Sequence, residues 1–119
     1  MDLIIGGAWQ GKREYAIEHF GFNEEDIFIC TEDGNVDLGA KCIYGIENYV
    51  LWCVKNGVTP REGFRSDAVV ICRDISSGIV PVDPVIRKWR EDYGRYCQRL
   101  AKKSDTVTRM FCGLPQRIK

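Results

Sequence analysis

The sequence has no apolar run approaching the ~20 residues that a membrane-spanning helix needs. Its first residues, Met1 to Ile5, show neither the basic stretch nor the cleavage site of a signal peptide. It also has no excess of one charge, because 17 basic residues balance 17 acidic ones. We therefore do not expect nucleic acid or a membrane surface as a partner, and we expect a cytoplasmic protein.

The pattern of a zinc site is also absent. The chain has one histidine, His19, and none of its six cysteines forms a Cys-x-x-Cys pair. Most of the cysteines stand in apolar runs, so we expect buried, reduced thiols that pack as small hydrophobic groups. The cysteines in such runs are Cys30, Cys53, Cys72 and Cys112. We expect His19 to be a surface residue rather than a catalyst.

The apolar pattern that is present predicts a single domain over residues 1–119. Short apolar runs at 3–5, 26–30, 67–72 and 106–112 predict strands, the last ended by Gly113-Leu114-Pro115, and helical periodicity marks 11–20, 40–57 and 83–103. We expect the strand at 26–30 to be covered on both faces. The alternating order predicts an α/β fold, an open and mostly parallel sheet in three layers with helices on both faces.

Four polar segments follow the expected strands. They are residues 6–13, 31–35, 73–78 and 113–116. Because ligands gather at the carboxyl ends of parallel strands, we expect these segments to share one edge of the sheet.

The first of these segments has the layout of a phosphate-binding P-loop. It consists of Gly6, Gly7, Ala8, Trp9, Gln10, Gly11, Lys12 and Arg13, and it matches G-x-x-x-x-G-K-[ST] at seven of eight positions. In such a loop backbone N–H groups and the start of the helix bind phosphate oxygens, and Lys12 would contact the β- and γ-phosphates of a nucleotide. The alternative is that the glycines only turn a strand into a helix.

Arg13 is the position that departs from the motif. A serine or threonine there normally binds Mg²⁺ together with an acidic residue from a neighbouring strand, for which Asp74 is the candidate. Arg13 has no lone pair, so it would repel the ion, or replace its charge by pairing with phosphate or with Asp74. Trp9 is expected either to pack within the protein or to stack on a base, a substrate ring or a partner subunit.

Several segments carry a family resemblance. They are Gly6-Gly7-Ala8-x-x-Gly11-Lys12, Asp74 to Pro84 with its Gly-Ile-Val-Pro, Arg87 to Arg95, Gln98 to Ala101, and Cys112 to Lys119. In this order they resemble the cobinamide kinase / cobinamide-phosphate guanylyltransferase family of cobalamin biosynthesis.

The resemblance implies a P-loop fold that binds GTP or ATP and transfers phosphate to a hydroxyl of cobinamide, a corrinoid. Lys12 and Asp74 would be the catalytic residues, with Asp74 holding Mg²⁺ or activating the hydroxyl. The family's oligomers suggest a homo-oligomer, and Trp9 and Trp89, which we expect to be exposed, are compatible with it. Guanylyl transfer is not expected, because the family's guanylylated histidine follows the second strand and no histidine follows His19.

Three hypotheses stay open after the sequence. The first is a kinase-like enzyme that uses GTP or ATP, and the second is a catalytically inactive nucleotide-binding protein with a regulatory or assembly role. The third is an interaction domain in which the glycine loop has no ligand. The departure at Arg13 favours the second hypothesis, whereas the intact Lys12 favours nucleotide binding in either of the first two.

Overall fold

The computed structural model describes residues 1–76 and 78–119. Ser77, which belongs to the expected loop 73–78, lies outside the described residues. The elements in chain order are β1 (Asp2–Gly6), α1 (Lys12–Phe20), the 3-10 turn η1 (Glu24–Asp26), β2 (Ile27–Ile29), β3 (Cys42–Tyr44), α2 (Ile46–Asn56), β4 (Val69–Arg73), α3 (Pro84–Lys103), β5 (Thr106–Phe111) and β6 (Leu114–Arg117).

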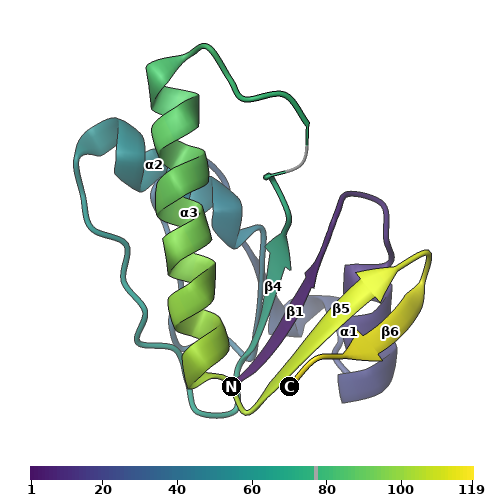
Figure 1. The fold of residues 1–119 in the computed structure, drawn as a ribbon. Coiled ribbons are helices and arrows are strands. Elements are labelled where there is room, and N and C mark those ends of the chain that lie inside the picture. The colour runs from purple at the N-terminus through teal and green to yellow at the C-terminus, as the bar shows by residue number, and fades with distance from the viewer. Residues whose placement is uncertain (77) are drawn as a thin grey trace.

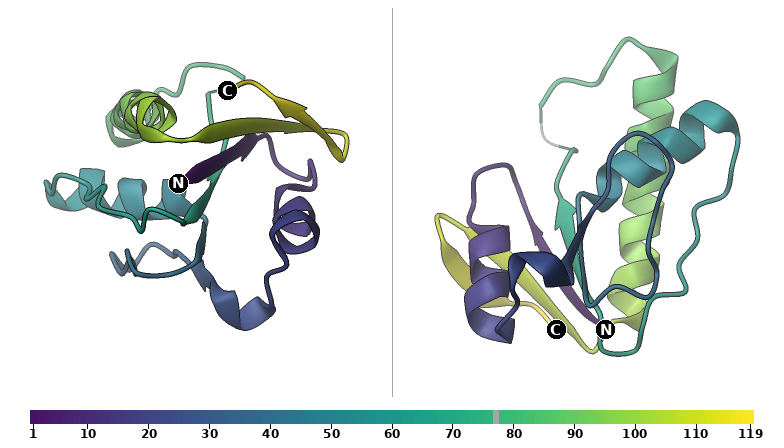
Figure 2. Two further views of the ribbon diagram at one scale, coloured as in Figure 1. Left: turned by 90° about the horizontal axis from the view of Figure 1, so that it is seen from below. Right: turned by 180° about the vertical axis from the view of Figure 1, so that it is seen from behind.

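The strands of the described residues form one sheet in the order β2-β3-β4-β1-β5-β6. Strands β1 to β5 are parallel to their neighbours, and β6 alone pairs antiparallel, with β5. Helices α2 and α3 pack together over one face, and α1 lies on the other (Figures 1 and 2). The expected α/β class and mostly parallel sheet are therefore confirmed.

The sheet is buried on both faces because its central strands carry unbroken apolar runs, Leu3 to Ile5 on β1 and Val69 to Cys72 on β4. On β4, Val70 and Cys72 belong to the core beneath α2 and α3, whereas Val69 and Ile71 belong to the core beneath α1. This division follows from the alternation of side chains along a strand. The uninterrupted apolar runs of the sequence are thus the mark of parallel strands in a three-layer fold.

The helix expected over 40–57 is wrong in its first part. Cys42–Tyr44 forms β3, between β2 and β4, and α2 begins only at Ile46. A short apolar run can satisfy both the helical and the strand pattern, so periodicity does not separate them. The break between them is Gly45, whose φ of 79° lies in the left-handed region that glycine adopts at little cost.

Two expectations about strands at the sheet edges are also wrong. The second strand is not covered on both faces, because β2 is an edge strand and Ile29 is 48% exposed. The chain does not leave the sheet after β5, because Gly113 turns it into β6, where a proline is tolerated at the outer edge. Gln116 lies opposite Arg109 and so runs away from the carboxyl edge.

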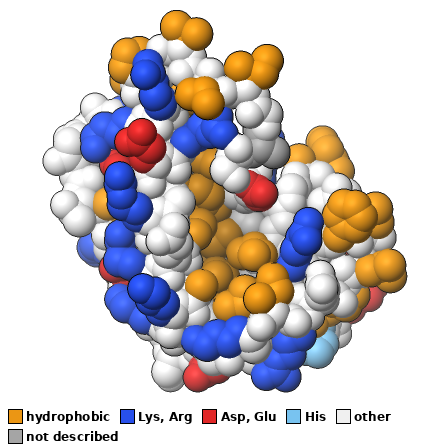
Figure 3. Space-filling model, in the orientation of Figure 1, with side chains coloured by type: hydrophobic (Ala, Val, Ile, Leu, Met, Phe, Trp, Pro, Cys, Tyr) orange, Lys and Arg blue, Asp and Glu red, His pale blue; other side chains and the backbone are white. Residues whose placement is uncertain are grey.

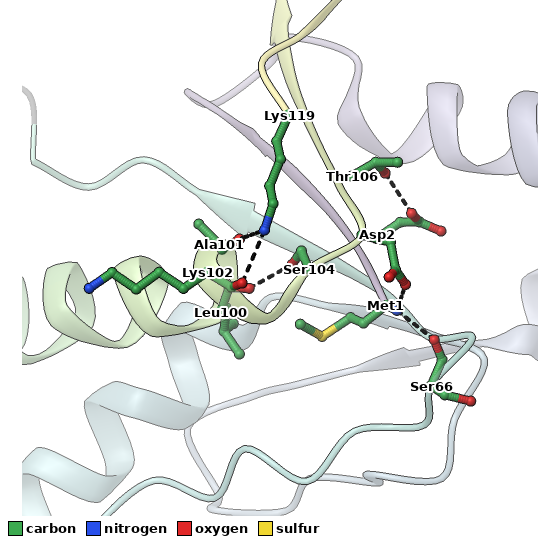
Figure 4. Close-up of polar contacts among 10 residues, drawn as sticks. Met1, Asp2, Ser66, Leu100, Ala101, Lys102, Ser104, Thr106 and Lys119 are labelled. Atoms are coloured by element: carbon green, nitrogen blue, oxygen red, sulfur yellow. Dashed lines mark hydrogen bonds and ion pairs between the residues drawn. The ribbon is translucent and has the colours of Figure 1, made fainter.

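Both chain ends are fastened where β1 begins, as the close-up in Figure 4 shows. The amino group of Met1 donates to the backbone carbonyl of Ser66 and pairs with the Asp105 carboxylate at 2.7 Å. The ammonium group of Lys119 donates to the carbonyl of Ala101, at the end of α3, at 3.0 Å. These contacts lie at the amino end of β1, opposite the carboxyl end from which the glycine loop continues.

The cysteines are free thiols, but they are not all buried. The buried ones are Cys30, Cys42, Cys53 and Cys72. Cys97 is partly buried, and Cys112 is exposed at the β5–β6 turn, where its φ of 52° is left-handed. The prediction that Cys112 is buried is wrong, because the apolar run Phe111-Cys112 on which it depends is itself exposed. None of the described helices is long and apolar enough to cross a membrane.

Candidate functional site

The glycine loop lies between its neighbouring loops at the carboxyl edge of the sheet. The amide of Asp74, just after β4, donates to the carbonyl of Gly6 at 2.8 Å. On the other side, the amide of Gly113 donates to the carbonyl of Gln10 at 3.1 Å, and the amide of Cys112 donates to the Gln10 side chain. Three of the four expected segments therefore meet, and the fourth, residues 31–35, follows β2 at the same edge.

The loop ends at a helix terminus without a side-chain cap. Gly11 precedes α1 with a φ of 85°, and within the described part of the chain this helix start has no side-chain cap hydrogen bond. The N–H groups of the first turn therefore keep their capacity to bind an anion, and the helix dipole adds a favourable field. Trp9, at the tip of the loop, also has a left-handed φ of 62°.

Lys12 is the buried cation beneath this loop. The residue is 6% exposed, and its Nζ donates a hydrogen bond to the carbonyl of Gly7. Burial lowers the pKa of Lys12 from its usual range, and the nearby Glu47 carboxylate opposes part of that shift. Among the described residues the Gly7 carbonyl is its one hydrogen-bond partner, so the ammonium group has donors left over for phosphate oxygens.

Gly6 is required by close packing, which a substitution can test. A Cβ built on Gly6 would lie 2.8 Å from the backbone carbonyl oxygen of Met110, whereas one on Gly7 would meet nothing closer than 3.9 Å. We expect Gly6→Ala to lower the free energy of unfolding by about 1–3 kcal/mol, because β1 and β5 must separate. The matched control Gly7→Ala should change it by less than about 1 kcal/mol. Urea unfolding of the two variants measures the difference, and equal stabilities would contradict the close packing.

One pocket lies directly beside Lys12, and we call it the lysine pocket. It measures about 360 Å³ and is lined by Ala8, Trp9, Lys12, Tyr44, Gly45, Glu47, Asn48, Ile71 and Arg73. Glu47, in the first turn of α2, is 7% exposed, and its carboxylate accepts a hydrogen bond from the amide of Arg73 at 3.3 Å. The sequence does not single out Glu47, because the helical periodicity over 40–57 conceals that α2 begins at Ile46, directly before Glu47.

Arg13 does not reach Asp74. Its guanidinium group pairs with Glu24 and lies over the ring of Tyr44, 5.7 Å from the centroid. Asp74 instead accepts hydrogen bonds from the amide and the hydroxyl of Ser76, at 2.9 and 2.6 Å. Of the alternatives for Arg13, pairing with Asp74 is therefore not found, and Arg13 is held against residues beside the loop.

A second pocket, the apolar cavity, opens on the α3 side of the loop. It also measures about 360 Å³ and is lined by β1, β4, α3 and β5, with the ring of Tyr93 and the side chains of Ile5 and Met110 among its walls. Figure 3 shows apolar side chains on the floor of the hollow between α3 and the β5–β6 hairpin. Polar groups surround it, so the cavity suits a ligand with an apolar body and a polar group.

Asp74 belongs to the apolar cavity rather than to the lysine pocket. Its hydrogen bonds from Ser76 hold the pKa of the Asp74 carboxyl below its usual range, and Arg109 and Arg90 lower it further. The group is therefore a carboxylate at neutral pH, able to accept a hydrogen bond from a hydroxyl group.

The two tryptophans expected to be exposed differ. Trp9 is 98% exposed, as expected, so of its two alternatives the packing within the protein is excluded. Trp89 is partly buried, and its Nε1 donates to the carbonyl of Glu47 at 2.9 Å, so the expected exposure of Trp89 is wrong. It sits on the inner side of α3 and fastens α3 to the start of α2.

No group of three or more histidine, cysteine or acidic side chains that could hold a metal ion is found among the described residues. Asp74 and Glu47 lie in different pockets, and Arg13 replaces the usual hydroxyl. A set with one carboxylate fits Mg²⁺ only as part of a nucleotide complex, since Mg²⁺ is commonly held by one or two carboxylates plus substrate phosphates.

His19 is exposed and stacks on Tyr15, with centroids 5.0 Å apart.

Comparison with known proteins supports a family assignment. A family model described as cobinamide kinase / cobinamide phosphate guanyltransferase matches residues 41–118, about two thirds of the chain. The match includes β3, β4, α3 and the closing hairpin, but not the glycine loop. No curated protein matches the chain.

Proposed function

We propose that the chain, which belongs to the cobinamide kinase / cobinamide phosphate guanyltransferase family, binds GTP or ATP and transfers phosphate to a cobinamide hydroxyl. The observation that carries this proposal is Lys12. Its ammonium group is buried beneath an uncapped helix start, at the wall of the lysine pocket. This combination of a fixed cation and free N–H groups is what a polyphosphate requires.

The two pockets suggest how donor and acceptor would be separated. The nucleotide phosphates would lie over Gly7 to Lys12, with their outermost group toward the lysine pocket. The acceptor would enter the apolar cavity, where the Asp74 carboxylate would accept a hydrogen bond from its hydroxyl group and orient it for in-line attack. Phosphoryl transfer needs mainly such positioning and neutralisation of charge, so few reacting side chains are required.

Mg²⁺ is proposed to arrive with the nucleotide rather than to reside in the protein. Bound to the phosphates, it would neutralise negative charge that develops during transfer. Glu47 is a carboxylate that lines the lysine pocket with Lys12, and it would hold water molecules of the ion. Asp74 remains the alternative ligand proposed from its place after β4.

Guanylyl transfer through a histidine is not part of the proposal. His19, the one histidine, lies in the last turn of α1, away from the end that carries the loop. Its ring stacks on Tyr15 at the surface. Neither pocket includes it, so we expect no covalent guanylyl intermediate.

The proposed function is tested by titration and by product analysis. Calorimetric titration with GTP and ATP, with and without Mg²⁺, should show binding of at least one of them. Incubation of that nucleotide with adenosylcobinamide should then yield the phosphorylated corrinoid, detected by mass spectrometry. Absence of nucleotide binding would overturn the proposal, whereas binding without product would leave a catalytically inactive nucleotide-binding protein with a regulatory or assembly role.

The contacts of Arg13 favour that second function. Its pairing with Glu24 and Tyr44 places a cation beside the loop where the motif has a hydroxyl group. In a protein that binds nucleotide without Mg²⁺, such a positive charge would favour binding of the phosphates. The contribution of the ion to catalysis would be lost.

Substitution of Arg13 distinguishes the two functions. We expect Arg13→Ser to make nucleotide binding dependent on Mg²⁺, because it removes the cation and supplies the missing hydroxyl group. Arg13→Ala is the matched control, since it loses the same ion pair but gains no Mg²⁺ ligand. Titrations at zero and saturating Mg²⁺ measure the effect. Identical behaviour of both variants would show that position 13 has no part in metal binding.

A further inference from the structure

Two thiols from different elements meet at the wall of the apolar cavity. Cys72 is the penultimate residue of β4, and the alternation of that strand turns its side chain toward α3. Cys97 lies on α3, one turn after Tyr93, and packs against the same core. Both thiols are free, and both line the cavity.

The surroundings of the pair make its two sulfur atoms unequal. A hydrogen bond from Cys72 lowers the pKa of the Cys97 thiol, and the same contact, together with burial, raises the pKa of Cys72. The hydroxyl of Tyr93, 3% exposed, lies beside both and has no hydrogen-bond partner of normal geometry among the described residues. Cys97 is therefore the thiol that loses its proton more readily, and it is also the less buried of the two.

We propose that Cys72 and Cys97 are a redox-active dithiol that closes to a disulfide when the protein meets a peroxide. The Cys97 thiolate attacks one oxygen of hydrogen peroxide, the O–O bond breaks, and a sulfenic acid forms while the departing hydroxide takes up a proton to become water. The Cys72 sulfur then attacks the sulfenic sulfur, loses its proton and releases a second water molecule. The two thiols lose two electrons in total, and the peroxide gains them.

The disulfide would change the cavity that the proposed function assigns to the acceptor. It would link α3 covalently to the end of β4, two residues before Asp74. In the reduced state this wall of the cavity is formed by side chains of α3 that pack against the sheet without a covalent link. We expect the cavity to admit ligands less readily in the oxidised state. This effect on activity rests on the proposed function, but the formation of the disulfide does not.

Peptide mapping tests the dithiol directly. The full chain carrying Cys112→Ser, which removes the exposed thiol, is reduced, treated with hydrogen peroxide, denatured, alkylated and digested with trypsin. We expect two of the five remaining thiols to be lost, and the fragments Ser66–Arg73 and Tyr96–Arg99 to appear joined, two hydrogen atoms lighter than their sum. The joined fragments should disappear after reduction.

A matched variant separates a dithiol from a reactive lone cysteine. With Cys72→Ser added, Cys97 has no partner, so peroxide should convert it to the sulfinic acid. The proposal is overturned if the parent protein also forms the sulfinic acid without joined fragments, or if it keeps all five thiols. If the fragments join but phosphorylation activity does not fall reversibly, the dithiol stands and only its effect on the acceptor cavity is refuted.

Discussion

Lys12→Met should weaken nucleotide binding by roughly 10- to 150-fold in Kd. A hydrogen bond to a charged group contributes about 1.5–3 kcal/mol, and each 1.4 kcal/mol corresponds to roughly tenfold in affinity. Methionine keeps much of the length of the buried side chain, which is 6% exposed in the native residue, while removing its charge. Calorimetric titration with the nucleotide that the native protein binds gives the measurement.

The control for this variant is Lys102→Met, at an exposed lysine of α3. It removes the same charge far along the chain from the loop, so its Kd should equal that of the native protein. If both variants bind equally well, the glycine loop is not the phosphate site. If both bind equally weakly, the effect is one of net charge rather than of position.

The pH dependence of binding provides a second readout for Lys12. Because burial lowers its pKa below the usual 10.5, the ammonium group loses its proton at a lower pH than an exposed lysine does. Nucleotide affinity should therefore be constant below that pKa and should fall as the pH rises through it. The Lys12→Met variant lacks this titration and should show no such fall.

Asp74→Asn should reduce phosphoryl transfer by roughly 10²-fold, the lower end of the range for a group that handles a proton in the transition state. The amide keeps an oxygen that can accept the hydrogen bonds from Ser76, so we expect the loop to keep its shape. The nucleotide Kd should be unchanged because Asp74 lines the apolar cavity. Steady-state kinetics with adenosylcobinamide and the nucleotide would measure the loss in kcat.

Glu47→Gln is the informative comparison for that variant. The amide oxygen can still accept the bond from the Arg73 amide, but the negative charge beside Lys12 is gone. We expect the Mg²⁺ concentration that gives half-maximal activity to rise, with a smaller effect on kcat at saturating Mg²⁺. The reverse pattern, with Asp74→Asn alone dependent on Mg²⁺, would identify Asp74 as the ligand of the metal complex.

The parts of the fold that could be predicted from the sequence are those where local signals agree. The run Leu3 to Ile5 is apolar on both faces, and the glycines after it end the strand, so β1, the loop and α1 lie where expected. Asp83 accepts a hydrogen bond from the amide of Val85 and is followed by Pro84, and these two residues marked the start of α3. In each case the residue that breaks one element is next to the residues that build the following one.

The parts that could not be predicted depend on tertiary pairing. Nothing local distinguishes Cys42–Tyr44 from the first turn of a helix, because the hydrogen bonds that make it a strand come from β2 and β4. The same error concealed Glu47, whose burial follows from the position of β3. The exposure of Cys112 and Phe111 likewise reflects the turn into β6, which is set by pairing with β5.

The candidate site shows the same division. The sequence predicts that the loop from Gly6 to Lys12 and the residue Asp74 lie at the same edge of the sheet, because the carboxyl ends of parallel strands point in one direction. It did not indicate that Asp74 and Lys12 would line different pockets, or that Arg13 would turn toward Glu24. Those outcomes depend on side chains from β3, η1 and α3, which are distant in sequence from the loop.

The most direct test of a phosphate site at Gly6 to Arg13 is the amide NMR spectrum of the ¹⁵N-labelled protein during titration with a non-hydrolysable GTP or ATP analogue. We predict that the largest and saturable shifts belong to the amides of Gly7 to Arg13, followed by those of Asp74 and Gly113, whose N–H groups bond to the loop. Saturable shifts confined to other surfaces, or no shifts with either analogue, would contradict the proposal.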